Sequence, residues 1–180
     1  KIHDFLYLSN GNLLLGTNRG LFSCNISGKP RNTSFFPNKR IPADKKSLSN
    51  DMVTNIRRAH DGTIYVATYG GGLNIVESGD ILSGSIAFNA LTTDNGMVSD
   101  VALSLCEDGR GRIWVVSEHS LMEYDPRSKT FSNYTDGFFA EKLSFSEVKP
   151  LYSKTTATLL LGTTQGLLKL STKNTGTSKF

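Results

Sequence analysis

The chain has 180 residues, a formal net charge of +4 and 38% hydrophobic residues. This length normally forms one domain or two small ones, and the hydrophobic fraction supports a folded core, which excludes a disordered chain. No apolar run approaches the roughly 18–20 residues that span a bilayer. Lys and Arg are scattered instead of forming the basic stripe of a nucleic-acid-binding surface. We therefore expect no nucleic acid partner and no direct membrane contact.

The first predicted unit contains four short β-strands, which we label strands A to D in chain order. An apolar segment at residues 5–8 is followed by an Asn-Gly turn at residues 10–12 and a second apolar segment at residues 13–17. A third segment begins at residue 20, and the Phe-Phe pair at residues 35–36 marks a fourth. Asn-Gly between short β-prone segments is a strong hairpin signal, because both residues tolerate positive φ.

The same succession returns three more times along the chain. Strand A recurs at residues 53–56, 101–105 and 148–152. Strand B recurs at residues 64–68, 113–117 and 159–163, and strand C at residues 72–75, 120–124 and 166–170. Strand D is found at residues 85–91 and 130–134. The turns between strands A and B contain Asp-Gly in the second and third copies, whereas the fourth copy lacks glycine there.

These repeats predict an all-β fold made of consecutive four-stranded antiparallel blades of a β-propeller, because such blades recur at about 40–50 residues. The approximate blades are residues 1–50, 51–98, 99–145 and 146–180, and the last is incomplete. A helical solenoid would need apolar residues at helical spacing over longer segments. Helix content should be close to nil.

Strand B is apolar over several consecutive positions, which indicates a strand covered on both faces. Gly16, Ala67 and Gly162 occupy the same repeat position, where a small side chain lets the neighbouring blade pack closely. Val116 breaks this rule, so the third blade should pack slightly differently.

The two cysteines, Cys24 and Cys106, fall in the first and third repeats. No further Cys or His lies at a metal-ligand spacing from either one. We interpret them as small buried hydrophobic residues and do not expect a disulfide between them.

No sequence motif assembles a catalytic, metal or cofactor site, and none of the three is expected. The glycines at residues 70–72 lack the helix and the Lys-Ser/Thr pair of a phosphate loop, so we interpret them as a turn. The histidines His3, His60 and His119 lie in different repeats. Asp61 and Asp108 occupy matching turn positions, where Asp stabilises a turn through its backbone.

Strand direction alternates within a blade, so the turns between strands B and C gather on one face with the linkers between blades. Polar and aromatic side chains stand at matching positions of these turns, as expected for sugar recognition. The predicted ligand-binding residues are Arg19, Tyr69, Glu118, His119 and Gln165.

Several of these segments resemble the two-component regulator propeller repeat. The resemblance rests on Asp-Gly-Arg-Gly-Arg-Ile-Trp-Val at residues 108–115, on Leu-Leu-Leu-Gly-Thr followed by Gly-Leu at residues 13–21 and 159–167, and on Gly-Met-Val-Ser-Asp-Val at residues 96–101. It implies the periplasmic, non-enzymatic sensor region of a Bacteroides-type hybrid histidine kinase. Such a sensor would detect oligosaccharides and control transcription of polysaccharide-utilisation genes.

Four repeats do not fill the seven-bladed ring that the resemblance implies. The start at Lys1 and the missing fourth strand at the end suggest a piece of a larger propeller, and a closed four-bladed ring is the alternative. Open ends would expose apolar faces, so further blades, self-association or a homodimer are expected. Two functions remain as alternatives: a propeller-type lyase or other propeller enzyme, and a non-catalytic interaction scaffold.

Overall fold

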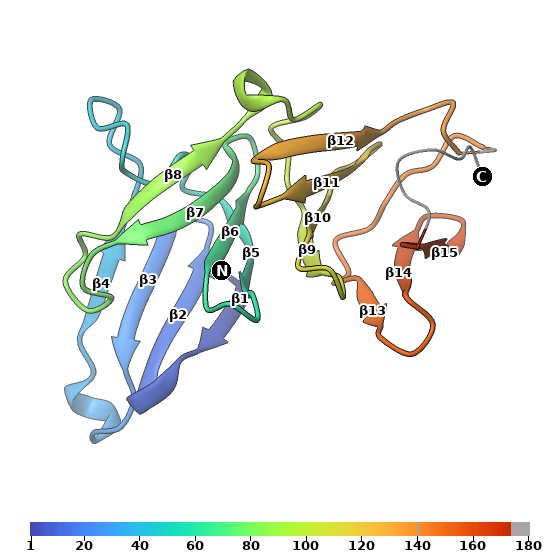
Figure 1. Cartoon of the computed structure of the whole chain (residues 1–180). Helices are drawn as coiled ribbons and strands as arrows, with labels where there is room; N and C mark the ends of the chain where they lie inside the picture. The colour runs from blue at the N-terminus through green and yellow to red at the C-terminus, as the bar shows by residue number, and fades with distance from the viewer. Residues whose placement is uncertain (140, 174–180) are drawn as a thin grey trace.

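The computed structural model describes residues 1–139 and 141–173, and in this part of the chain fifteen strands form four antiparallel sheets (Figure 1). The first sheet contains β1 (Ile2–Tyr7), β2 (Asn12–Thr17), β3 (Gly20–Asn25) and β4 (Phe35–Asn38), and the second contains β5 (Val53–Arg58), β6 (Ile64–Thr68), β7 (Gly72–Ser78) and β8 (Ala87–Leu91). The third contains β9 (Ser104–Glu107), β10 (Ile113–Val116), β11 (Leu121–Asp125) and β12 (Thr130–Tyr134). The fourth contains β13 (Leu151–Ser153), β14 (Thr158–Thr163) and β15 (Gly166–Ser171).

Each sheet keeps its strands in chain order, which is the strand order of a propeller blade. The first strands lie innermost, since β5 contacts both β1 and β9, and β9 contacts β13. Figure 1 shows β1, β5, β9 and β13 toward the middle, with β4, β8 and β12 at the periphery. The prediction of an all-β fold made of propeller blades is confirmed. The described residues contain only 3-10 turns as helices, and none of these is long and apolar enough to cross a membrane.

The expected turns form between strands A and B. Gly62 adopts a φ of 92°, and Asp61 accepts a hydrogen bond from the Thr63 amide at 2.9 Å. Asp108 accepts one from the Arg110 amide at 2.8 Å. Both aspartates therefore stabilise their turns as predicted. In the fourth copy, Ala157 takes a positive φ of 51°.

Three apolar cores fill the spaces between successive sheets. The core between the first and second sheets includes Leu14, Val53 and Phe88, while that between the third and fourth includes Trp114 and Leu161. The core between the second and third sheets includes Tyr65, Ala67, Leu105 and Val115. Strands β6 and β10 are buried on both faces, as the continuous apolar pattern of strand B predicts.

The small residues of strand B leave room for atoms that approach them closely, from the next blade at Gly16 and from the same blade at Gly162. A Cβ atom added to Gly16 would lie 2.7 Å from Cγ1 of Val53 in the next blade. One added to Gly162 would lie 2.5 Å from the Ser146 hydroxyl. Val116 stands at this position in the third sheet, is buried, and packs in the core against the fourth sheet. A larger side chain is thus accommodated in this one blade, in line with the expected difference in packing.

Both cysteines are free and buried, which confirms their interpretation as core residues. Burial raises the pKa of the Cys106 thiol to about 11, and burial also raises the pKa of Cys24.

A chain of polar contacts runs along the innermost strands at equivalent repeat positions. The Asn55 side chain donates to Asp4 at 2.9 Å, and the Leu105 amide donates to Asn55 at 3.1 Å. Ser104 donates to the carbonyl that precedes Lys149 at 3.4 Å, and the Lys149 ammonium reaches Asp4 at 2.6 Å. We call Asp4, Asn55, Ser104 and Lys149 the axial polar chain.

The outer faces of the first and fourth sheets carry exposed apolar side chains. Phe5 and Tyr7 are 65% and 59% exposed on β1, and Leu151 and Leu167 are 63% and 70% exposed in the fourth sheet. The chain therefore presents an apolar sheet face at each end of the row of blades. The prediction that the tail lacks a fourth strand falls mainly on residues 174–180, which lie outside the described residues.

Candidate ligand-binding site

The five predicted binding residues lie on the turns between the second and third strands of their blades. Tyr69 directly follows β6, and Glu118 and His119 lie between β10 and β11. Arg19 lies between β2 and β3, and Gln165 lies between β14 and β15. Antiparallel strands return the chain to the same edge, so these turns share one face of the row of blades, as predicted.

Two of the five residues meet, and a third adjoins them in the chain. The Tyr69 hydroxyl donates a hydrogen bond of 2.7 Å to Oε1 of Glu118, which joins the turn of the second blade to that of the third. This hydrogen bond, and then the carboxylate charge, raise the pKa of Tyr69. His119 neighbours Glu118 in the chain, and its Nδ1 lies 3.2 Å from the Ser144 hydroxyl and 3.4 Å from the Leu143 carbonyl oxygen.

A cavity of about 300 Å³ lies beside this cluster, and we call it the B–C cavity. Its lining residues are Val98, Ser99, Ser117, Glu118, His119, Ser120, Thr135 and Asp136. The Ser117 hydroxyl donates to the Ser99 hydroxyl at 3.1 Å, which ties the linker between blades to the wall of the cavity. Hydroxyl, carboxylate and imidazole groups therefore face one small opening.

Arg19 and Gln165 are not part of this cluster. Each is exposed, and its backbone amide donates to a threonine hydroxyl of its own turn, at 3.0 Å for Arg19 and 3.2 Å for Gln165. Neither residue lines the B–C cavity, because their blades stand at the two ends of the row. The predicted role of Arg19 and Gln165 in ligand binding stays a prediction.

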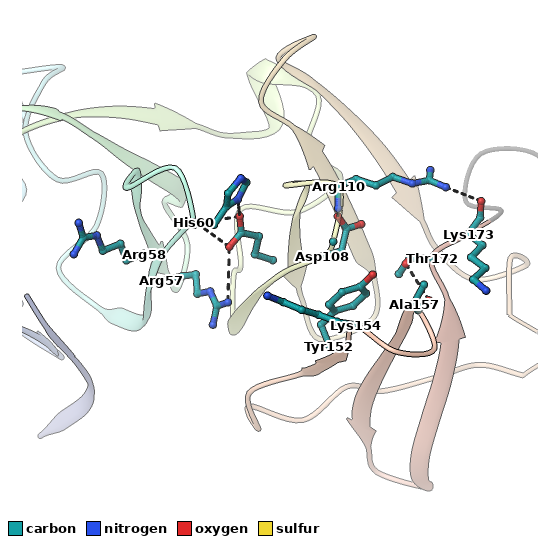
Figure 2. A pocket seen from close by; sticks show the side chains of 12 residues that line it. Arg57, Arg58, His60, Asp108, Arg110, Tyr152, Lys154, Ala157, Thr172 and Lys173 are labelled. Atoms are coloured by element: carbon teal, nitrogen blue, oxygen red, sulfur yellow. Dashed lines mark hydrogen bonds and ion pairs between the residues drawn. The ribbon is translucent and has the colours of Figure 1, made fainter.

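A larger cavity of about 680 Å³ lies on the opposite face, which the sequence did not single out (Figure 2). It is enclosed by the turns between strands A and B of the second, third and fourth blades, and we call it the A–B cavity. Its cationic lining residues are Arg57, Arg58, Arg110, Lys154 and Lys173. A sequence signal did exist, since these cations stand at or near corresponding turns of successive repeats.

Two carboxylates line the A–B cavity, and both are buried. Glu107 faces the second blade, and its Oε1 lies 2.5 Å from Nδ1 of His60. Its Oε2 lies 3.9 Å from the Arg57 guanidinium. Asp108 lies one residue further along the third blade and forms part of the cavity wall.

Asp108 belongs to a buried polar network inside the third blade. Its Oδ2 accepts from Nε of Arg112 at 2.8 Å and from the Trp114 indole at 3.0 Å. Arg112 also pairs with Glu123, whose other oxygen accepts from the Tyr134 hydroxyl at 2.8 Å. Burial acts to lower the pKa of Arg112, but Asp108 and Glu123 outweigh it and raise that pKa.

Within residues 1–139 and 141–173, no three His, Cys, Asp or Glu side chains converge as a possible metal site.

No protein-family model and no curated protein matches the sequence. Solved structures do match. The extracellular domain of BT3049, described as a hybrid two-component system of Bacteroides thetaiotaomicron, superposes with a TM-score of 0.66 and 13% identity over 96% of this chain and 28% of that chain. The extracellular domain of BT4673, described as a one-component system of the same organism, gives a TM-score of 0.66 and 24% identity over 95% of this chain and 21% of that chain.

A third solved structure, PorZ, is a bacterial surface component of the type-IX secretion system of Porphyromonas gingivalis. It gives a TM-score of 0.73 and 14% identity over 99% of this chain and 27% of that chain. At these identities the likeness establishes the propeller fold. The chain spans between a fifth and a third of the length of each of these structures.

Proposed function

We propose that this chain is a segment of an extracytoplasmic sensor propeller and that it binds an oligosaccharide at the B–C cavity. The single observation that carries the proposal is the hydrogen bond between Tyr69 and Glu118, which joins two blades beside that cavity. The similar structures from Bacteroides thetaiotaomicron are extracellular domains of signalling systems, which supports the sensor role.

The groups at the B–C cavity suit a sugar. Glu118 offers carboxylate oxygens as acceptors, while the Ser117 and Ser120 hydroxyls both donate and accept. Tyr69 does not line the cavity itself, but its hydroxyl is bonded to Glu118 of the lining, and the residue is 39% exposed. A few polar groups converging on a concave opening fix the orientation of a small ligand.

A ligand at this position would act on the contact between two blades. The Tyr69–Glu118 hydrogen bond and the Ser117–Ser99 hydrogen bond both cross from the second blade or its linker to the third. A sugar that replaces or reinforces these bonds favours one relative position of the blades. In a longer protein, this shift would pass to a histidine kinase and to transcription of polysaccharide-utilisation genes. The chain itself performs no catalysis in this proposal.

The open sheet faces fit the same proposal. Phe5 and Tyr7 at one end and Leu151 and Leu167 at the other are exposed as the inner faces of neighbouring blades would be. We propose that further blades of a longer periplasmic chain cover them, and that the isolated chain self-associates through them. Light scattering of the chain over a hundredfold concentration range tests this, and a strictly monomeric chain would contradict it.

The ligand proposal is tested by glycan-array screening followed by calorimetry on the full chain and on the longer protein that contains it. Tyr69→Phe removes only the hydroxyl and Glu118→Gln removes only the charge. Each variant should weaken binding of the array-selected oligosaccharide by roughly three- to tenfold, the range that loss of one hydrogen bond produces. Gln165→Ala is the matched control. It alters the equivalent turn of the fourth blade, and Gln165 does not line the cavity.

Two results would overturn the proposal. The first is that neither protein binds any glycan on the array. The second is that Gln165→Ala reduces binding as much as Glu118→Gln, because the sugar would then lie elsewhere on this face. Turnover of a bound glycan would instead favour the alternative of a propeller enzyme.

A further inference from the structure

The A–B cavity plays no part in the function proposed above, and it lies on the opposite face of the blades. Its volume of about 680 Å³ falls within the range of about 300–1,000 Å³ that is usual for small-molecule sites. The turns of three successive blades enclose it, so a ligand there would touch all three. Figure 2 shows side chains from the second, third and fourth blades around one opening.

The lining of this cavity is strongly cationic. Five Lys and Arg side chains line it, against two carboxylates. Like charges gathered around a low-dielectric concave surface focus a positive potential into it. In Figure 2 the Lys154 side chain extends from the fourth blade toward Arg57 of the second.

The two carboxylates neutralise these cations only in part. Glu107 is bound by the His60 ring at 2.5 Å and by the His60 amide at 3.1 Å, and its second oxygen lies 3.9 Å from the half-exposed Arg57. Asp108 is bound inside its own blade by Arg112 and Trp114. Both carboxylates face groups of the protein and are 8% and 5% exposed.

Most of the lining cations carry no carboxylate partner among the described residues. Within this part of the chain, Arg58, Arg110 and Lys154 form no ion pair, whereas Arg57 lies 3.9 Å from Glu107. Arg110 donates to the backbone carbonyl of Lys173 at 2.9 Å, which directs its guanidinium without neutralising it. Repulsion among these charges is relieved by an anion placed between them.

The cavity also offers a surface for a ring. Tyr152 lies among the lining residues and is half-buried. Tyr152 can approach the backbone of Gly109 because that residue has no side chain. A Cβ atom at Gly109 would lie 2.8 Å from the Tyr152 hydroxyl. The aromatic ring is thereby held in the wall between the cations of the second and third blades.

We propose that the A–B cavity binds an acidic saccharide of about two sugar units, through carboxylate or sulfate groups that contact Arg57 and Lys154. The oxyanions satisfy cations that stand on different blades, and the Tyr152 ring contacts a sugar face. A ligand that carries two or more oxyanion groups fits better than a ligand that carries a single one, because the cations come from separate turns.

Calorimetry on the full chain at low ionic strength tests this proposal with three probes. These are α-1,4-linked digalacturonate, the uncharged α-1,4-linked galactobiose of the same ring stereochemistry, and inorganic sulfate. Digalacturonate should bind at least about tenfold more tightly than galactobiose, and its affinity should fall as salt is added, because the contacts are exposed. Sulfate at tens of millimolar should displace it.

Variants locate the site. Lys154→Gln and Arg57→Gln should each weaken digalacturonate binding about tenfold or more. Arg127→Gln removes an exposed arginine from another turn on the same face, outside the cavity, and should leave binding unchanged. Glu118→Gln should also leave it unchanged, so failure here and failure of the B–C proposal are distinguishable. Circular dichroism confirms that each variant is folded.

Several results would overturn the proposal. Equal affinities for digalacturonate and galactobiose would show that charge is not recognised. No binding of digalacturonate at millimolar concentration would show that the cations are only solvated. Failure of sulfate to compete would place recognition on the sugar ring alone. If Arg127→Gln weakened binding as much as Lys154→Gln, binding would depend on the net charge of the protein and not on the cavity.

Discussion

Replacing Asp108 by Asn isolates the contribution of one buried carboxylate to the stability of the third blade. The side chain of Asp108 is fully buried and lies 2.6 Å from Nη2 of Arg112. It also accepts from the Trp114 indole and from the Arg110 amide. Asn has nearly the same shape, but its NH2 group must face one of these donors, and its neutral charge leaves Arg112 with Glu123 alone.

The expected loss of stability follows from breaking a buried pair while keeping one partner. Removing one member of such a pair costs about 3–5 kcal/mol when the remaining charge is left buried and uncompensated. Arg112 keeps its ion pair with Glu123, so we expect a loss at the lower end of this range, about 3 kcal/mol. For a chain of this length, 1 kcal/mol lowers Tm by about 2–4 °C, so Asp108→Asn should lower Tm by roughly 6–12 °C.

Urea unfolding followed by tryptophan fluorescence measures this loss directly. Trp114 is the single tryptophan of the chain and is fully buried in the same network. The matched control is Asp61→Asn, which alters the equivalent turn of the second blade. Asp61 is exposed, and the hydrogen bond from the Thr63 amide lowers its pKa. The control should therefore change the free energy of unfolding by less than about 1 kcal/mol.

The reasoning fails if Asp108→Asn unfolds within 1 kcal/mol of the unmodified chain. It fails equally if the two variants lose the same stability, since the turn alone would then explain both.

Two further predictions concern the packing of the blades. Gly16→Ala should destabilise the chain by about 1–3 kcal/mol in urea unfolding, because its Cβ would lie 2.7 Å from Val53, whereas Gly28→Ala, which meets no atom within 4 Å, should not. The buried thiols of Cys24 and Cys106 should resist alkylation at pH 8 in the folded chain and react in urea. Because the pKa of Cys106 is raised from 9.0 to about 11, its contribution to stability should be complete below about pH 9 and lost as the pH rises toward 11.

The fold was predictable from the sequence because its signals are local. Short apolar segments and Asp-Gly or Asn-Gly turns specify each hairpin within about ten residues. The repeat then places the hairpins in equivalent sheets, and β12 (Thr130–Tyr134) forms over the predicted residues. The innermost strands shifted most, and β9 (Ser104–Glu107) begins three residues later than expected, because its start at Val101 instead bridges to Tyr69 of the neighbouring blade.

The candidate sites were only partly predictable, because they depend on contacts between blades. The repeat placed Tyr69 and Glu118 on one face, but it gave no measure of the distance between turns. Arg19 and Gln165 lie on equivalent turns of the first and fourth blades and do not line the B–C cavity. The A–B cavity was not predicted, because its cationic lining residues come from three different repeats and no single repeat shows a cluster of positive charge. Lys154 and Arg57 are almost a hundred residues apart in the chain, and the fold brings both to the lining of one cavity.

The axial polar chain has a consequence for the order of the blades. Four copies of one unit share a fold, yet the equivalent inner positions hold Asp4, Asn55, Ser104 and Lys149, which are unlike residues. The Asp4 carboxylate finds a donor in Asn55 on the next blade and a cation in Lys149. Packing the first blade against a different neighbour would bury the Asp4 carboxylate without its donor, which is unfavourable. The unlike polar residues thus favour the packing of each blade against its own neighbour over packing against another blade of the same fold.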